Sequence, residues 1–470
     1  MGFRVVGRLL LAQALSSLGT SMSTVALAMM VYKLTGSVLH MGGVMAAATL
    51  PLVVTAWIGG ALLDRYSARN VMVLADAVRA VLIFSMPFLA LRAVGLIYVV
   101  AALMGIFTAL FNPGQIKLIG ELVEKEHLVK ANSYLGVSRD GAELIGYLMG
   151  GVIASIAAVT ILGVTVTGYT VAFIVDAVSY LVSGILLIGL PRGPAHEGAA
   201  PKVRTLVAES PAVLGRLWRN PALRTNLLLA VFAAGAVMMY MPNSYGLALE
   251  VFDRGSLGLA ALEVFVAVGL IVGGLVFSRT RLKGDKNGYV FLSLAGVAIC
   301  LIAVSFSGLF WVSVVLLGIG GVGAVGMVVP AITMFQETPA SADKGRLIAL
   351  RSGFGQLGVA AGLVIGGFLG AQIGIKQAFL VAGAATIVIG LIIYIPYRLG
   401  ASRRARTAWR AAMASGATRS AARQMAQEAA YAGAAATSGG FGAPAAGVAA
   451  WAAAAEAAAL AGDAVALEEL

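Results

Sequence analysis

The fold is decided by the stretch Gly59-Gly60-Ala61-Leu62-Leu63-Asp64-Arg65-Tyr66-Ser67-Ala68-Arg69-Asn70, where one apolar run stops in a short charged turn. A second apolar run begins at once at Val71. Both runs are long enough to be membrane-spanning helices, since about 20 residues cross about 30 Å of hydrocarbon. So short a connection predicts two antiparallel, neighbouring helices, with the charged turn at one membrane face. The glycines leave room for another helix to approach where the first one ends.

Composition places the whole chain in a membrane. Of its 470 residues, 60% are hydrophobic and 11% are charged, and the mean hydropathy is +0.93. A water-soluble domain does not have such values. Backbone polar groups inside a bilayer must be satisfied within the segment, so the choice lies between helices and a closed barrel. The apolar runs are continuous rather than alternating, which excludes the barrel. We therefore expect an all-α membrane protein.

Twelve apolar runs predict twelve transmembrane helices, with both termini on the same side because the number is even. Basic residues gather in the loops on that side, and by the positive-inside rule it is the cytoplasmic side of the inner membrane. The net charge of +12 is explained in this way, without nucleic acid as a partner. The spans are expected at residues 6–32, 40–63, 71–91, 95–119, 133–159, 168–190, 225–249, 257–279, 289–307, 310–334, 346–371 and 377–397.

The two halves of the chain resemble each other at an offset near 215 residues. The pair Gly59-Gly60 corresponds to Gly273-Gly274, and Gly146 with Gly150-Gly151 corresponds to Gly362 with Gly366-Gly367. A duplication of six helices explains the constant offset, and it places a substrate path between the halves near mid-membrane. We therefore expect four regions: a six-helix half at 1–190, a cytoplasmic linker at 191–224, a second six-helix half at 225–398, and an Ala/Arg-rich cytoplasmic tail at 399–470.

Two further segments are expected to lie outside the bundle. The middle of the linker, residues 203–217, is a candidate for a helix on the membrane surface. In the tail, six arginines among alanines between Arg403 and Arg423 suggest an amphipathic helix held against anionic lipid. The alternative for the tail is a loosely helical or disordered segment without any chemistry.

Several motifs resemble one transporter family. The pattern G-x-x-x-D-R at residues 60–65, followed by Arg69, resembles the loop between helices 2 and 3 of the major facilitator superfamily. Phe111-Asn112-Pro113, Gly120-Glu121-Leu122-Val123, Arg139 and Gly345-Arg346 resemble its branch of bacterial enterobactin and macrolide exporters. The resemblance covers residues 5–398. It implies alternating access around a cavity between the halves, and the polar or aromatic candidates to line that cavity are Trp57, Tyr240, Asn243, Tyr245 and Gln356.

Charged residues next to the turn are candidates for an inner gate. Asp64 ends its helix at the cytoplasmic face, where it can meet the positive N-terminus of the helix expected at 346–371. Such a contact must break when the protein opens inward, as alternating access requires. The alternative is that the charges only mark a cytoplasmic turn. The expected gating residues are Gly60, Asp64, Arg65, Arg69, Arg346 and Arg351.

Carboxylates within the apolar runs are candidates for proton coupling. An ionised carboxylate in hydrocarbon is costly, so such a residue faces a cavity, pairs with a cation or takes up a proton. Glu143, Asp176 and Glu263 are the candidates, and Asp76 with Arg79 is expected to form an ion pair within one helix. Glu143 precedes Gly146-Tyr147-Leu148-Met149-Gly150-Gly151, which resembles the antiporter signature G-P-x-x-G-G with Tyr147 in place of Pro. A carboxylate with access to water near the lipid boundary is the alternative.

The sequence contains no motif that is typical of ATP binding, metal binding or enzyme catalysis. The chain has no G-x-x-x-x-G-K-[ST], H-E-x-x-H or C-x-x-C sequence, so we expect neither ATP-driven transport nor an enzyme, a metal site or a cofactor. The first hypothesis is a proton-coupled exporter of a small amphipathic organic compound. The alternatives are a lipid or lysolipid transporter of the same fold, and a non-transporting membrane scaffold that recruits a partner through its tail.

Overall fold

The computed structural model describes the backbone of residues 2–123, 128–156, 159–161, 164–191, 213–215, 217–280, 282, 284–337 and 344–431. Within these ranges the side chains of 2–6, 54–65, 128–133, 159–161, 164–166, 336–337, 344–346, 348–349, 428 and 431 are not described. Most of the expected surface helix at 203–217 therefore lies outside the described residues. Val213 and Leu217, at its end, are buried against Leu223, Phe335 and Leu350.

The first group of helices is built from the N-terminal part of the chain. Within it α1 packs against α5 and α6, α3 packs against α4 and α6, and α2 packs against α4. Its helices are α1 (Gly2–Thr35), α2 (Val38–Arg65), α3 (Ala68–Ala90), α4 (Val94–Leu122), α5 (Leu128–Ala154) and α6 (Gly168–Ile188).

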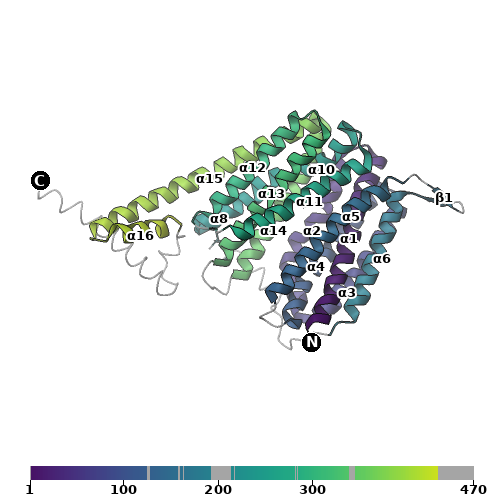
Figure 1. Cartoon of the computed structure of the whole chain (residues 1–470), viewed down its shortest axis with the longest axis horizontal. Coiled ribbons are helices and arrows are strands. Elements are labelled where there is room, and N and C mark those ends of the chain that lie inside the picture. Colours follow the sequence, from purple (N-terminus) through teal and green to yellow (C-terminus); the bar gives the residue numbers. More distant parts are fainter. Residues whose placement is uncertain are drawn as a thin grey trace, which may run out of the picture.

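The second group is built from the C-terminal part, and Figure 1 shows it beside the first. Here α13 packs against α11 and α12, α12 against α15, and α14 against α9 and α10. Two π-helical segments, η2 and η3, interrupt the first membrane-spanning stretch of this group. Its elements are α8 (Pro221–Leu228), η2 (Leu229–Ala233), α9 (Ala234–Met238), α10 (Tyr240–Gly246), η3 (Leu247–Val251), α11 (Gly255–Arg279), α12 (Lys286–Phe306), α13 (Phe310–Glu337), α14 (Lys344–Ile373), α15 (Ile375–Ala414) and α16 (Arg419–Tyr431).

Ten helical stretches among the described residues are long and apolar enough to cross a membrane. Two further helices, α2 with 28 residues and α5 with 27, have spanning length, but α2 qualifies only as the shorter apolar stretch Val38–Val53. A predominantly helical membrane fold is thus established, while the number of twelve spans stays a prediction.

The charged turn lies at the expected position. Helix α2 ends at Arg65 and α3 begins at Ala68, with Ser67 as the N-cap accepting a hydrogen bond from the Asn70 backbone N–H. Among the described residues α2 and α3 each pack against α4, and their main contacts are not with each other. The side chains of α2 next to the turn, residues 54–65, are not described, so the expectation that α2 and α3 are neighbours stays a prediction.

The segment after α5 is not helical to residue 159 as predicted. The helix stops at Ala154, and strands β1 (Val159–Ile161) and β2 (Val164–Val166) form an antiparallel pair in which Val159 faces Val166. β-Branched residues favour the extended backbone. This hairpin projects from one end of the bundle in Figure 1. That end, which also carries the α1–α2 connection, is called the hairpin face below, and the end with the N-terminus is called the N-terminal face.

The last predicted span continues far beyond its expected end at residue 397. Helix α15 runs unbroken for 40 residues, from Ile375 to Ala414. After a turn in which Gly416 has a φ of +79°, α16 packs back against α15. The first part of the tail is therefore a two-helix hairpin rather than the single helix expected at 403–423, and it extends away from the bundle (Figure 1).

Candidate functional site

The two helix groups meet along two seams, and closely packed glycines build the first one. On α5, Gly146 and Gly150 face α1, where a Cβ at Gly150 would lie 2.8 Å from the Met22 Cα. The next residue, Gly151, faces α11 of the other group, and a Cβ there would lie 3.1 Å from the Ser256 carbonyl oxygen. The Ser256 Oγ also donates a 2.9 Å hydrogen bond to the Gly151 carbonyl. Only glycine allows the helices to approach this closely.

The second seam repeats this arrangement 216 residues later. On α14, Gly362 and Gly366 face α9 and its C-terminal end at Met239, within their own group. Gly367 faces α2 of the other group, where a Cβ would lie 2.9 Å from the Val38 carbonyl oxygen. Gly42 of α2 in turn packs against the backbone of Leu363. Both seams lie near the hairpin face, so the two groups are closed against each other at that end.

The α5–α11 contact, which we name the acidic seam, carries the two glutamates. Glu143, Tyr147 and Gly151 follow each other at steps of four residues and so share one face of α5. Glu263 lies seven residues after Ser256 on the opposing helix α11. The phenol of Tyr147 interacts electrostatically with Glu263 and, more weakly, with Glu143. The structure thus brings both glutamates around one tyrosine, although 120 residues separate them in sequence.

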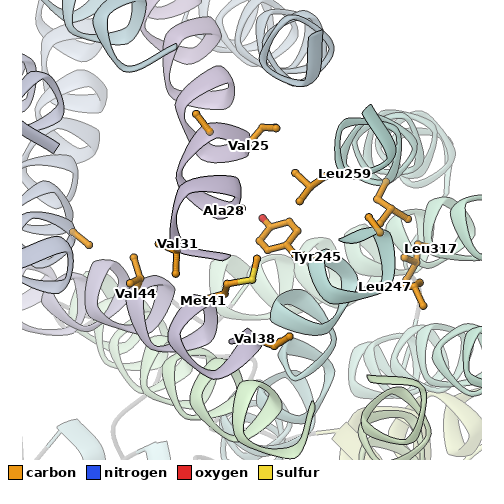
Figure 2. Packing of buried hydrophobic residues seen from close by; sticks show 14 of the residues in the cluster. Val25, Ala28, Val31, Val38, Met41, Val44, Tyr245, Leu247, Leu259 and Leu317 are labelled. Carbon is orange, nitrogen blue, oxygen red and sulfur yellow. The ribbon is translucent and has the colours of Figure 1, made fainter. Parts of the chain in front are cut away.

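Two more tyrosines, both on α10, lie near Glu263. Tyr240 and Tyr245 both interact electrostatically with its carboxylate. Tyr245 is 1% exposed, and Figure 2 shows its ring among residues of α1, α2 and α11. The hydroxyl of Tyr245 has no hydrogen bond of ordinary geometry in the structure. The neighbour of this buried hydroxyl is the Glu263 carboxylate, so the two groups form one polar site.

The two glutamates differ in their environment. Glu143 is half-buried and lies 3.8 Å from Arg139 on the same helix, and both side chains remain partly exposed. No described basic side chain forms an ion pair with Glu263, which is also half-buried. An ionised carboxylate without a nearby cation is destabilised in an apolar bundle. Taking up a proton removes this destabilisation.

Asp76 and Arg79 form an ion pair on α3, and both side chains are buried. The Ser183 Oγ donates a 2.7 Å hydrogen bond to Asp76, and the Arg79 guanidinium stacks 4.4 Å from the ring centres of Phe111 and Tyr180. These contacts connect α3, α4 and α6 inside the first group. A buried ion pair held by so many partners within one group suits a structural role.

Asp176 lies in the same layer of the first group. It is fully buried and accepts hydrogen bonds from the Ser23 Oγ at 2.5 Å and the Ser179 Oγ at 3.2 Å. The bond from Ser23 connects α6 to α1. The structure therefore places this third acid away from the seams, in contact with neighbours of its own group.

Two expected gating residues make contacts within their own groups. Arg69 donates to the Ile188 and Leu190 carbonyls at the end of α6, at 3.2 and 2.9 Å, a favourable place for a cation at a helix C-terminus. Arg351 donates a 2.7 Å bond to Asn226 and lies 5.8 Å from the Phe335 ring centre. The side chains of Gly60, Asp64, Arg65 and Arg346 lie outside the described residues.

The remaining cavity candidates occupy different environments. Asn243 is fully buried, and its Nδ2 donates to the Met239 and Gly366 carbonyls at 2.8 Å each. It therefore connects α10 to α14 within the second group. Gln356 is half-buried on α14, and the side chain of Trp57 is not described. Sequence reasoning missed Ser256 as a seam residue and treated Tyr147 only as a departure from a motif.

Comparison with known proteins gives consistent matches. The sequence profile of the Major Facilitator Superfamily matches residues 9–289. The chain is 28% identical to the uncharacterized MFS-type transporter YfiS of Bacillus subtilis (strain 168), over 84% of this chain and 94% of that protein. It is 25% identical to the multidrug efflux pump Tap of Mycolicibacterium fortuitum, over 83% and 95% of the two chains.

Two further matches bear on substrate and fold. The lysophospholipid transporter LplT of Serratia proteamaculans (strain 568) is 29% identical over 262 residues, which are 53% of this chain and 61% of that protein. Among solved structures, the D-xylose-proton symporter superposes with a TM-score of 0.65 at 14% identity, over 83% of this chain and 97% of that chain. A likeness at this identity concerns the fold.

Proposed function

Because the chain belongs to the Major Facilitator Superfamily, we propose that it exports a small amphipathic organic compound in exchange for protons. Membership makes it a multi-pass membrane transporter and not an enzyme. The similarity to efflux proteins such as Tap supports export as the direction. A non-transporting scaffold is the weaker hypothesis, since the family and these relatives transport small molecules.

The proposed mechanism is alternating access between two six-helix halves, residues 1–190 and 225–398, joined by the linker 191–224. In this proposal the N-terminal face is cytoplasmic, as the basic loops suggest. The two glycine seams then close the extracellular end, and the structure corresponds to a state that opens toward the cytoplasm. The engagement of Arg69 and Arg351 within their own groups supports this assignment. In the opposite state, Asp64 would meet Arg346 and the N-terminus of α14.

The position of Glu263 carries the proposal of proton coupling. This carboxylate lies at the contact of the two halves, among Tyr147, Tyr240 and Tyr245 and without a basic partner in the described part of the chain. Protonation removes its charge and lowers the cost of closing the seam around it. Glu143 on the opposing helix is the second proton site, and we assign Asp76, Arg79 and Asp176 to the packing of the first half.

The tyrosines of the acidic seam suit the proposed substrate. Tyr240 and Tyr245 offer aromatic faces with a polar group at one end, which matches a compound with an apolar and a polar part. Gln356 and Trp57 are the further proposed cavity residues. Asn243, whose amide is bound to the α14 backbone, belongs to the packing of the second half instead.

Transport in everted membrane vesicles tests the coupling. We expect Glu263→Gln to abolish efflux driven by a pH gradient and Glu143→Gln to reduce it. The control Asp253→Asn, at an exposed carboxylate before α11 whose positive φ asparagine tolerates, should retain it. An unchanged proton dependence in both glutamine variants would eliminate the proposal. The inner gate has its own test, because Asp64→Asn should shift the balance toward the state open to the cytoplasm.

The similarity to LplT favours lysophospholipid movement as the second candidate function. A panel of organic compounds and one lysophospholipid, each measured for accumulation with and without a proton uncoupler, separates the two. Export of the compounds that stops with the uncoupler supports the first proposal. Transport of the lysophospholipid alone supports the second.

A further inference from the structure

The tail hairpin, defined as residues 398–431, stands apart from the transport machinery. At 1.5 Å per residue, α15 is about 60 Å long, roughly twice the thickness of the hydrocarbon core. Its apolar part ends near Leu399, so the helix leaves the hydrocarbon close to Arg398. The segment that follows therefore begins at the level of the lipid headgroups.

The two helices of the tail hairpin are packed into a defined arrangement. Ala408 and Ala412 of α15 and Ala422 and Ala430 of α16 are buried, because small residues let the helices approach closely. The Arg404 Nη2 donates a 3.0 Å hydrogen bond to the Ala430 carbonyl, near the end of α16. This contact holds the end of α16 against α15 close to the membrane.

A basic cleft opens between the two helices at this point. Its volume is about 630 Å³, within the range of sites that hold a small molecule. Arg406 of α15 and Arg423 of α16 both line it, and both are exposed. The tail hairpin contains seven arginines and one acid in its sequence. The polar lining consists of Arg398, Ser402, Arg406, Arg423 and Gln427.

We propose that this cleft binds a phosphate-bearing anion, supplied by the membrane as the headgroup of an anionic phospholipid. Guanidinium groups from two helices can hold phosphate oxygens in the paired geometry that arginine favours. The Gln427 amide adds a neutral donor at the same site. The position of Arg398 at the end of the apolar run favours a lipid over a free anion, because headgroup phosphates lie at this depth.

Two double variants with the same loss of charge test the cleft. Arg406→Gln with Arg423→Gln removes one lining arginine from each of the two helices. Arg410→Gln with Arg419→Gln removes two exposed arginines of the tail hairpin that do not line it. The full-length protein in detergent is titrated with phosphatidylglycerol, phosphatidylcholine or inorganic pyrophosphate, and bound lipid is counted by native mass spectrometry.

We expect the cleft variant to bind phosphatidylglycerol at least about tenfold more weakly than the parent protein, while the control variant stays within about threefold of it. If the arginines attract the lipid only through their overall charge, both variants should lose affinity for phosphatidylglycerol equally, by about fivefold for each arginine removed. Equal losses, or no loss in either variant, overturn the proposal. Binding of pyrophosphate that depends on Arg406 and Arg423, without binding of phosphatidylglycerol, keeps the phosphate site and rejects the lipid as its source. Helical content measured by circular dichroism verifies that both variants are folded.

Discussion

The acidic seam and the α2–α14 contact, which we name the apolar seam, share one backbone design and differ in chemistry. Each uses two glycines to pack inside its own group and a third to cross to the other group. At the offset of 216 residues that relates the glycines of α5 to those of α14, Glu143 and Tyr147 correspond to Val359 and Leu363. At the offset of 214 that relates Gly59-Gly60 to Gly273-Gly274, Glu263 corresponds to Thr49, which does not titrate. Leu363 is buried with Ala46 and Ala360 in an apolar cluster.

This difference indicates that the two seams have different functions. The described side chains that pack across the apolar seam are apolar. The nearby His40 of α2 instead contacts Tyr98 of α4, within the first group, so we expect closure of this seam not to depend on pH. Closing the acidic seam surrounds two carboxylates whose charge depends on protonation. If the duplicated helices once gave two equal contacts, only one of them now has the chemistry to respond to a proton.

We expect the largest effect on transport from variants that disrupt the close glycine packing found at both seams. Gly151→Leu and Gly367→Leu each place a side chain where the opposing backbone lies about 3 Å from a Cβ. Overpacking of this kind costs about 1–3 kcal/mol, which shifts the balance between conformers by roughly 5- to 150-fold toward opening at the hairpin face. Both variants should therefore lose most of their transport.

Cysteine accessibility measures this shift, with probes placed near the hairpin face in a Cys300→Ser background, since Cys300 is the one native cysteine. Gly274→Leu on α11 is the matched control, because nothing lies within 4 Å of a Cβ there. If the control shifts the balance as much as Gly151→Leu does, close packing at the seams is not what holds the end closed.

The sequence alone predicted the repeated glycines but not the direction that each one faces. A constant offset indicates duplication, yet only packing tells that Gly150 contacts its own group and Gly151 the other. The steps of four from Glu143 through Tyr147 to Gly151 were a readable signal that these residues share a face. No local pattern connects that face to Glu263, because contacts between helices so far apart in sequence depend on tertiary structure.

Two features at the ends of the bundle were not predicted from the sequence. A continuous apolar run predicted a helix up to residue 159, whereas β-branched residues at 159–161 and 164–166 form a hairpin. The Arg- and Ala-rich tail offered no apolar stripe strong enough to predict that α16 would fold back. The alanines that pack it, such as Ala412 and Ala422, are the same residue type as their exposed neighbours.

The second-largest expected effect is a difference between the two seams in how the stability of their closed state depends on pH. The closed acidic seam favours protonated carboxylates, so it binds more protons than the open state and becomes more stable as the pH falls. Linkage limits the change to about tenfold in the conformer ratio per pH unit for each proton taken up. Accessibility of a cysteine near Gly151 should therefore decrease at lower pH in the parent protein.

The double variant Glu143→Gln with Glu263→Gln should make that accessibility independent of pH. The control Asp253→Asn, at an exposed carboxylate before α11, should leave the dependence in place. If the parent protein shows no pH dependence at all, the two seams do not differ in function, and the acids have another role.

The smallest effect concerns the hydrogen bond that the Ser256 hydroxyl makes across the acidic seam. Ser256→Ala removes the 2.9 Å bond to the Gly151 carbonyl but leaves the helices free to pack. A neutral hydrogen bond contributes about 0.5–1.5 kcal/mol, so opening at the hairpin face should become about 2- to 13-fold more favourable. Ser278→Ala is the control, since that hydroxyl donates to Leu275 within α11 itself. Equal behaviour of the two variants would mean that glycine packing alone closes the acidic seam, which would make its closure as purely steric as that of the apolar seam.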